Sequence, residues 1–448
     1  MVLMSSCLLL GTSSCKKYLA ASTSKSLVTV TSVYDLQALL DTYYNMNTIC
    51  AEASDEASDD YFMSDSTLQA LNSVFGEDVY LWRPGMFDNG SYDWVDEYTI
   101  VYNANLVLDN MSNVTRTSEN AAALDNCKGQ ALVFRAKSFL EVAAIWAKAY
   151  DSSSAATTLG IPLRLTSDFN APSTRATLKQ TFEQILSDLN AALPLLPRTP
   201  VFIYRPSKEA AYGMLARTYL AMRDYTNAAA YADSALQINS ALVDFNTLSA
   251  TGGYPFSATV YTNPEEMMYT SVTLYNENLY QAYMFVDTTL YASYSNNDLR
   301  KTIYFAPSVD GYFYWQGSYA GNYIDYNGPA TDEMFLIKAE GLARANDVAG
   351  SMVALNAVLS KRWVTNTFTP FSAPTADSAL AIVLKERRKE LCFRSVRWTD
   401  IKRLNLENAN ISITRVVGGK TYTLPPNDPR FAMPIPTNVV SIAGIAQN

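Results

Sequence analysis

The first candidate for chemistry in this chain is an acidic segment near its N-terminus. Residues Glu52–Asp60 place five carboxylates at positions i, i+3, i+4, i+7 and i+8, which share one face of a helix. Glycoside hydrolysis needs two carboxylates a few ångströms apart, so a hydrolase is one hypothesis. A calcium loop is not indicated, because the alternating oxygen ligands and the turn glycine are missing. We favour the alternative, a solvated or helix-capping acidic face without catalysis.

A second charged segment, Glu386–Leu404, carries seven cations with Phe393 and Trp398 between them. An anion site is one interpretation, but no glycine-rich loop or P-loop spacing is present to hold a phosphate. We favour a network inside the scaffold, in which the cations pair with acids of the same segment and their aliphatic stems cover the two rings. The expected partners are Arg387, Arg388 and Lys389 with Glu386, Glu390 and Asp400.

Aromatic residues are concentrated between Tyr275 and Tyr326, where 15 occur in 52 residues without a helical period. A sugar presents apolar C–H faces and hydroxyls, so a glycan site needs exposed rings beside polar side chains. Most of the rings can instead pack this region onto the scaffold, since exposed aromatic patches are uncommon. The candidate ligand contacts, which include two residues from 61–91, are Tyr61, Trp82, Tyr275, Asn278, Tyr280, Tyr312, Tyr314, Trp315 and Tyr319.

Several chemistries are excluded by composition. Histidine is absent, which removes Ser-His-Asp and Cys-His catalysis and every histidine zinc site. Cys50, Cys127 and Cys392 lie among apolar neighbours and are expected to be small buried hydrophobes. The net charge of −9 disfavours a nucleic-acid partner. We therefore expect no catalytic residue, no metal and no cofactor.

Helical periodicity dominates the elements that must position these side chains. Apolar residues recur at helical spacing over residues 132–150 and 178–193, and over shorter stretches at 94–108 and 36–43. Residues 212–235 resemble a tetratricopeptide repeat, with small residues where two antiparallel helices approach, and residues 333–363 form a looser copy. The matching positions are Tyr212, Leu215, Ala216, Tyr219, Ala228, Ala232 and Ala235.

These patterns predict a mainly α fold: a tetratricopeptide-like helical scaffold with a large irregular, loop-rich insertion and minor β hairpins. One hairpin is expected around Gly418-Gly419. We expect a single domain over residues 15–448. Its scaffold covers about 30–60, 92–240 and 331–405, and its loop-rich ligand-binding part covers about 61–91, 241–330 and 406–448.

The N-terminal residues resemble a bacterial lipoprotein signal. Leu8–Leu10 are followed by small residues and then Cys15, which would become the lipidated residue after removal of residues 1–14. Thr12 stands where such signals usually have Leu, and no cation precedes the apolar stretch, which suggests a shortened or misplaced start. The sequence contains no run of about 20 apolar residues, so we expect no transmembrane helix.

Landmarks along almost the whole chain resemble the SusD/RagB-like family of outer-membrane nutrient-binding lipoproteins. The basic segment is similar to the family pattern E-R-R-x-E-L-x-F-x-x-x-R-W-x-D-L-x-R. A departure is the segment Gly328–Met334, which lacks the Arg that often precedes the family's next helix. The other landmarks, in order, are Cys15–Leu19, Asp55–Asp60, Trp94–Asn105, Gly129–Phe139, Leu159–Leu163, Asp188–Pro197, Asn297–Arg300, Met433–Pro436 and Gln447-Asn448.

The resemblance implies a surface-exposed lipoprotein of the outer membrane in Bacteroidota, held to the membrane only by its lipid. Members of this family cap a SusC-like TonB-dependent transporter and capture glycans or, in some cases, peptides; no catalysis is implied. We therefore expect a glycan-binding protein that hands its ligand to such a transporter. The alternatives are a peptide-binding member of the family, a carboxylate-dependent glycan hydrolase, and a tetratricopeptide adaptor that binds only protein.

Overall fold

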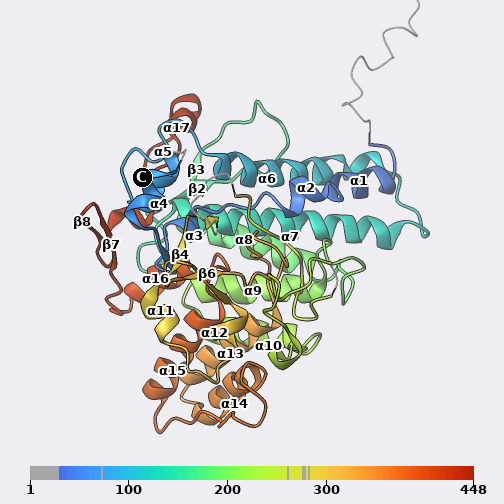
Figure 1. Cartoon of the computed structure of the whole chain (residues 1–448). Helices are drawn as coiled ribbons and strands as arrows, with labels where there is room; N and C mark the ends of the chain where they lie inside the picture. The colour runs from blue at the N-terminus through green and yellow to red at the C-terminus, as the bar shows by residue number, and fades with distance from the viewer. Residues whose placement is uncertain (1–29, 72–73, 260–261, 275–278, 281–282) are drawn as a thin grey trace, which may run out of the picture.

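The computed structural model describes residues 30–71, 74–259, 262–274, 279–280 and 283–448 (Figure 1). These residues form seventeen α-helices and four two-stranded antiparallel sheets. The predicted mainly α fold is therefore confirmed. The predicted lipidation site, Cys15, lies outside the described residues. Within them, no helix is both long and apolar enough to cross a bilayer.

Three long helices form the centre of the scaffold: α6 (Tyr92–Asn110), α7 (Ala121–Trp146) and α8 (Leu178–Ala192). The helices α6 and α8 begin at Ser91 and Thr177, whose hydroxyls accept a backbone N–H of the first turn. Because α7 packs against both neighbours, residues on nearly every side of it are buried. The helices predicted from the apolar periodicity are confirmed, although α7 ends at Trp146, before the predicted end at 150, and the stretch 36–43 is interrupted after Leu40.

Two antiparallel helix pairs continue the scaffold: α9 (Lys208–Ala221) with α10 (Tyr225–Leu236), and α13 (Thr331–Arg344) with α14 (Val348–Leu359). Figure 1 shows the long helices stacked in chain order from the blue and teal end to the orange end; they are α6, α7, α8, α9, α10, α13 and α14. Small residues let them approach, because a Cβ at Gly341 of α13 would lie only 2.5 Å from the Cβ of Ala229 on α10. The pairs match the two predicted repeats.

The strands are short and lie mostly in the loop-rich part. The pairs are β1 (Tyr61–Phe62) with β4 (Phe285–Val286), β2 (Leu159–Pro162) with β3 (Arg175–Thr177), β5 (Phe305–Pro307) with β6 (Phe313–Trp315), and β7 (Ile413–Val417) with β8 (Lys420–Leu424). The last pair is the predicted hairpin. Its turn residues Gly418 and Gly419 have φ of 55° and 72°, which a type I′ turn requires at both positions.

The remaining elements are shorter helices that join these parts. They are α1 (Val33–Leu40), α2 (Tyr43–Asn47), α3 (Ala53–Glu56), α4 (Asp65–Gln69), α5 (Val74–Tyr80), α11 (Thr288–Ala292), α12 (Arg300–Ile303), α15 (Ala376–Glu390), α16 (Arg397–Asn405) and α17 (Thr437–Ala443), with 3-10 turns η1 (Met111–Asn113), η2 (Phe245–Thr247) and η4 (Pro429–Phe431). The first of them begins at the predicted cap, Ser32, which forms a capping box with Asp35.

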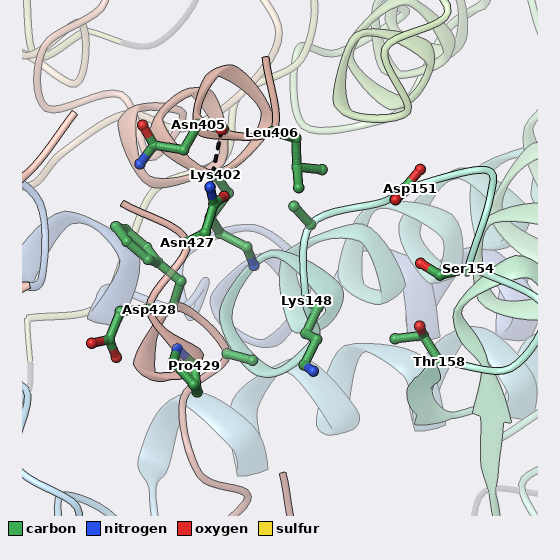
Figure 2. Close-up of a pocket in the computed structure, with 13 residues that line it drawn as sticks. Lys148, Asp151, Ser154, Thr158, Lys402, Asn405, Leu406, Asn427, Asp428 and Pro429 are labelled. Atoms are coloured by element: carbon green, nitrogen blue, oxygen red, sulfur yellow. Dashed lines mark hydrogen bonds between the residues drawn. The ribbon is translucent and has the colours of Figure 1, made fainter. Parts of the chain in front are cut away.

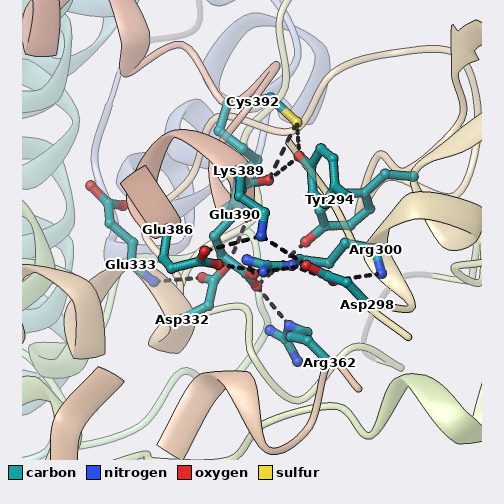
Figure 3. A network of polar contacts seen from close by, with 12 residues as sticks. Tyr294, Asp298, Arg300, Asp332, Glu333, Arg362, Glu386, Lys389, Glu390 and Cys392 are labelled. Atoms are coloured by element: carbon teal, nitrogen blue, oxygen red, sulfur yellow. Dashed lines mark hydrogen bonds and ion pairs between the residues drawn. The ribbon is translucent and has the colours of Figure 1, made fainter. Parts of the chain in front are cut away.

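A buried ionic network fastens the loop-rich insertion to the scaffold (Figure 3). The guanidinium of Arg300, which is fully buried, lies 2.7 Å from Asp298, 2.5 Å from Glu386 and 3.0 Å from Glu390. Arg362 continues the network with its Nε 2.7 Å from the same Glu390. Because two of these residues belong to the insertion and two to α15, the network fixes the position of the aromatic region against the helices.

Candidate functional site

The acidic segment Glu52–Asp60 is buried against the basic segment rather than solvated, which corrects the favoured interpretation of its face. Asp59 receives two hydrogen bonds from Arg397, at 2.6 and 2.8 Å. Asp55 accepts the backbone N–H of Ser395 at 3.0 Å. The partners lie more than 330 residues away in the sequence, so spacing within the segment carried no sign of them.

The two neighbouring carboxyls of this segment have opposite pKa shifts. Burial opposes ionisation of Asp59, but the guanidinium of Arg397 outweighs it and holds the pKa of this carboxyl below its usual value. Burial and the adjacent charge of Asp59 raise the pKa of Asp60 to about 7. Although such a split is typical of acid and base pairs, Asp59 is held by an ion pair and Asp60 accepts the backbone N–H of Phe393 at 3.3 Å. These contacts give both carboxyls a structural role.

The basic segment contains part of the predicted network. Arg387 pairs with Asp400 at 2.8 Å and Lys389 pairs with Glu386 at 3.0 Å, as expected. Arg388 instead contacts Asp59, at 3.1 Å. The remaining predicted acid, Glu390, binds the two arginines of the buried network described above. The rings of Phe393 and Trp398 are buried, so the prediction that this segment is scaffold is confirmed.

Two of the candidate ligand contacts, Trp315 and Tyr319, are buried in the core of the insertion. Trp315 stacks on Phe393 with ring centroids 4.9 Å apart and donates its indole N–H to Asp325 at 2.7 Å. The hydroxyl of Tyr319 lies 2.7 Å from Glu265. Because both side chains are buried and their polar atoms form hydrogen bonds inside the protein, we correct the prediction that these rings contact ligand.

Tyr61 and Trp82 are also buried, and their position has a clear cause. Together with Tyr80 they surround the guanidinium of Arg415 on β7, which lies 3.5 Å from the Tyr80 ring centroid and 4.9–5.1 Å from the other two. A cation held between aromatic faces is stabilised by the ring quadrupoles. These two rings therefore hold the β7–β8 hairpin in place, and the prediction that they contact ligand is corrected as well.

Three partly exposed rings, Phe62, Tyr312 and Tyr314, pack around the buried ring of Phe285, and we call these four rings the aromatic patch. Tyr312 is 40% exposed and lies at its centre, with ring centroids 5.0 Å from Phe62 and 5.1 Å from Phe285. The ring of Tyr314 lies roughly parallel to that of Phe285 at 6.3 Å. Successive side chains of a strand point to opposite faces, so Phe62 and Tyr314 face out where Tyr61 and Trp315 face in. Strand alternation at residues 61–62 was the signal that would have found Phe62.

Three candidate ligand contacts remain, and the structure describes one of them, Tyr280. Tyr280 is half-buried, donates its hydroxyl to the Leu274 carbonyl at 3.2 Å and packs edge-on against Tyr323 at 5.9 Å. Tyr323 is 52% exposed and was missed because no pattern distinguished it from the buried tyrosines nearby. Tyr275 and Asn278 lie outside the described residues.

Polar side chains lie beside the aromatic patch. Arg388 is partly exposed and lies 3.8 Å from Asp287, the residue after β4. Asp287 also caps α11 by accepting the N–H of Leu290 at 2.7 Å. Partly exposed rings beside charged groups can stack on the apolar face of a ligand and hydrogen-bond to its hydroxyls.

One cluster in the described part of the chain has ligand atoms close enough for a metal ion: Cys50, Glu97 and Glu141, within 4.8 Å of one another. The ammonium of Lys137 lies 3.1 Å from the Cys50 sulfur and is hydrogen-bonded to Glu141. A cation of the protein itself therefore occupies the position that a metal would take. Cys50, Cys127 and Cys392 are all buried free thiols, as predicted.

Two family models match this chain. A family model described as starch-binding and associating with the outer membrane matches residues 17–220, and the model of the SusD family matches residues 254–441. The chain belongs to the SusD family. A search of the curated proteins found no match.

Solved SusD-family structures share the fold of this protein over nearly its whole length. A SusD superfamily protein from Bacteroides thetaiotaomicron is 19% identical, with a TM-score of 0.74 over 93% of this chain and 99% of that one. A SusD-like carbohydrate-binding protein from Bacteroides vulgatus is 20% identical, with a TM-score of 0.69 over 92% and 97%. A laminarin-binding SusD-like protein is 17% identical, with a TM-score of 0.64 over 93% and 98%.

Proposed function

We propose that this SusD-family protein is a cell-surface lipoprotein that binds glycans through the aromatic patch and delivers them to a TonB-dependent transporter of the outer membrane. The observation that carries the proposal is that Tyr312 and Tyr314 face outward on a hairpin whose inner face is packed. Membership of a family with a starch-binding model and likeness to carbohydrate-binding and laminarin-binding structures support a glycan as the ligand.

The patch suits a sugar because its rings are already ordered before a ligand binds. The ring of Phe313, between Tyr312 and Tyr314, stacks on Tyr291 with ring centroids 3.6 Å apart, which fixes the inner face of the hairpin. Little conformational entropy is then lost on binding, so the stacking energy is not offset by ordering of the protein. Aromatic pairs gain about 0.5–1.5 kcal/mol beyond the area they bury, and we expect a ring stacked on a sugar to contribute a similar amount.

Anchoring and transport are further parts of the proposal. Cys15 would carry the lipid, and the scaffold and loop-rich part would form one domain whose loops hold the ligand. The family model described as associating with the outer membrane supports this location. Metabolic labelling with a fatty-acid analogue should mark the protein, and Cys15→Ser should abolish the label. Label that persists on the variant would reject Cys15 as the lipidation site.

The ligand proposal is tested by glycan-array binding of the purified chain, followed by titration of the strongest hit. We expect Tyr312→Ala with Tyr314→Ala to lower affinity by about tenfold or more, since two stacking contacts are lost. Tyr34→Ala, at an 80% exposed tyrosine of α1, is the matched control and should bind like the parent.

Three outcomes would contradict the proposal. Unchanged affinity of the double variant would remove the patch from the site. Binding of peptides but of no glycan on parallel arrays would favour the peptide-binding alternative. Shortening of a bound oligosaccharide by the purified protein would replace binding with hydrolysis.

A further inference from the structure

A cavity of about 190 Å³ opens at the C-terminal end of α7, between α16 and residues 427–432. None of the residues that line it belongs to the aromatic patch. Figure 2 shows Lys148 and Lys402 between residues 427–429 on one side and Asp151, Ser154 and Thr158 on the other. We call this cavity the lysine pocket.

Lys402 is 6% exposed and has one donor to spare. Its ammonium donates to the carbonyls of Ala144 and Ala147, both at 2.6 Å, and an ammonium has three N–H donors. Burial lowers the pKa of Lys402 to about 7, as expected for an amine that has no anion beside it. In the described part of the chain, neither Lys402 nor Lys148 takes part in an ion pair.

The two acids at the pocket are paired with arginines and not with the pocket lysines. Asp428 binds Arg430 through two hydrogen bonds of 2.8 and 2.9 Å, and Figure 2 shows its carboxylate turned away from the lysines. Asp151 accepts the N–H and hydroxyl of Ser153, at 3.2 and 2.9 Å, and lies 3.4 Å from Arg223. Lys148, together with the protonated form of Lys402, therefore gives the pocket a positive charge that no acid pairs with, in a protein whose net charge is −9.

The remaining lining determines the size and shape of an occupant. Ser154 and Thr158 offer hydroxyls on one wall, whereas Leu406, Phe431 and Ala432 form an apolar wall. The volume is below the roughly 300–1,000 Å³ of pockets for drug-sized ligands, so it admits one small molecule and not an oligosaccharide.

We propose that the lysine pocket is a second binding site that takes a small carboxylate, either a single sugar acid or another small organic acid. The carboxylate accepts the free N–H of Lys402 and the ammonium of Lys148, and its carbon skeleton lies on the apolar wall. Two charge-assisted hydrogen bonds in a partly desolvated site are stronger than neutral ones and select the ionised group.

The test is calorimetric titration of the full chain with glucuronate and with glucose, which differ by the carboxylate, in buffer of low ionic strength. We expect glucuronate to bind and glucose to show no binding at equal concentration. Lys148→Met should weaken glucuronate binding at least about tenfold, because a hydrogen bond to a charged group is lost. Lys402→Met should weaken glucuronate binding as much. If Lys402→Met fails to fold, because the hydrogen bonds of Lys402 to the last carbonyls of α7 are lost, Lys148→Met still tests the proposal.

Lys179→Met removes an equal charge from an exposed position on α8, 54% accessible, and should leave glucuronate binding unchanged. Acetate as a competitor separates the two ligand sources. Displacement of glucuronate by acetate supports a site for any small carboxylate, and resistance to acetate supports a site for sugar acids. Equal binding of glucose and glucuronate, binding of neither, or full glucuronate affinity in the folded Lys148→Met variant would overturn the proposal.

Discussion

The buried ionic network and the aromatic patch use similar residue types with opposite results. Around Arg300 every charge is paired with another inside the protein. Trp315 likewise uses its ring face and its indole N–H in contacts with Phe393 and Asp325. On the patch, Tyr312 keeps 40% of its surface open to solvent. We therefore expect ligand binding to involve side chains that the fold supports but does not use in internal contacts, rather than the most unusual residues of the sequence.

Arg300→Met tests the network, where we expect the largest effect. The substitution removes the buried cation that Asp298, Glu386 and Glu390 share, while Lys389 still contacts the first two acids and Arg362 still contacts the third. Removing one partner of a buried ion pair costs about 3–5 kcal/mol of unfolding free energy. Urea unfolding measures it. Lys179→Met breaks an exposed pair with Glu183, and it should change stability by less than about 1 kcal/mol. If the two substitutions lowered the unfolding free energy equally, the buried network would contribute no more to stability than an exposed ion pair.

Trp315→Phe separates the two regions, since Trp315 lies in the insertion but faces inward. The indole N–H to Asp325 is lost, whereas stacking on Phe393 is kept. We expect a loss of about 1–3 kcal/mol in unfolding free energy, because a buried acceptor is left unpaired. Glycan affinity of the folded variant should stay the same. A large loss of glycan affinity at temperatures where the variant is folded would show that Trp315 contributes to ligand binding.

Buried carboxyls predict how stability changes with pH. Burial raises the pKa of Asp55 to about 6 and of Asp60 and Asp93 to about 7, from 3.8 in the unfolded chain. The stability they contribute is complete below about pH 4 and is lost as pH rises toward 7, because the unfolded state ionises first. Burial acts to raise the pKa of Asp400, but Arg387 and Arg403 lower it to about 2, so its contribution is constant above about pH 5.

The unfolding free energy should therefore fall as pH rises from 5 toward 7, by at most about 1.4 kcal/mol per pH unit for Asp60 and Asp93, and for Asp55 only up to about pH 6. Asp93→Asn replaces one of them with a neutral group of the same shape that can still accept the N–H of Ala53, a contact of 3.0 Å in the parent. Urea unfolding at both pH values should show a shallower decline for this variant. An identical decline would show that Asp93 is ionised in the folded protein.

Sequence reasoning predicted the parts that depend on local periodicity. Helices α7 and α8 followed from apolar spacing, and the β7–β8 hairpin followed from Gly418-Gly419. It failed where pairing over long distances decides the outcome. The partners of Asp59 lie on α15 and α16, and Arg415 turns Tyr61 and Trp82 inward from the other end of the chain.

The same limit explains the candidate site. Sequence reasoning named Tyr312 and Tyr314 as candidates but could not separate them from Trp315 and Tyr319, which are buried. Which rings face solvent depends on the register of β5 against β6, where Ala306 pairs with Tyr314 and Phe305 with Trp315. A one-residue shift of that register would exchange the inner and outer rings.

Tyr312→Phe, set against Tyr312→Ala, gives the smallest expected effect and the sharpest view of the patch. If ligand binds by stacking on the ring face, Phe keeps the contact and affinity should change by less than about threefold, whereas Ala should lower it by about tenfold. Stability should change little in the Phe variant, because the ring packing with Phe62 and Phe285 is kept. Equal losses for Phe and Ala, measured by titration with the same glycan, would assign recognition to the hydroxyl. The patch would then recognise its ligand through directional hydrogen bonds, and its rings would have the same packing role as those around Arg415.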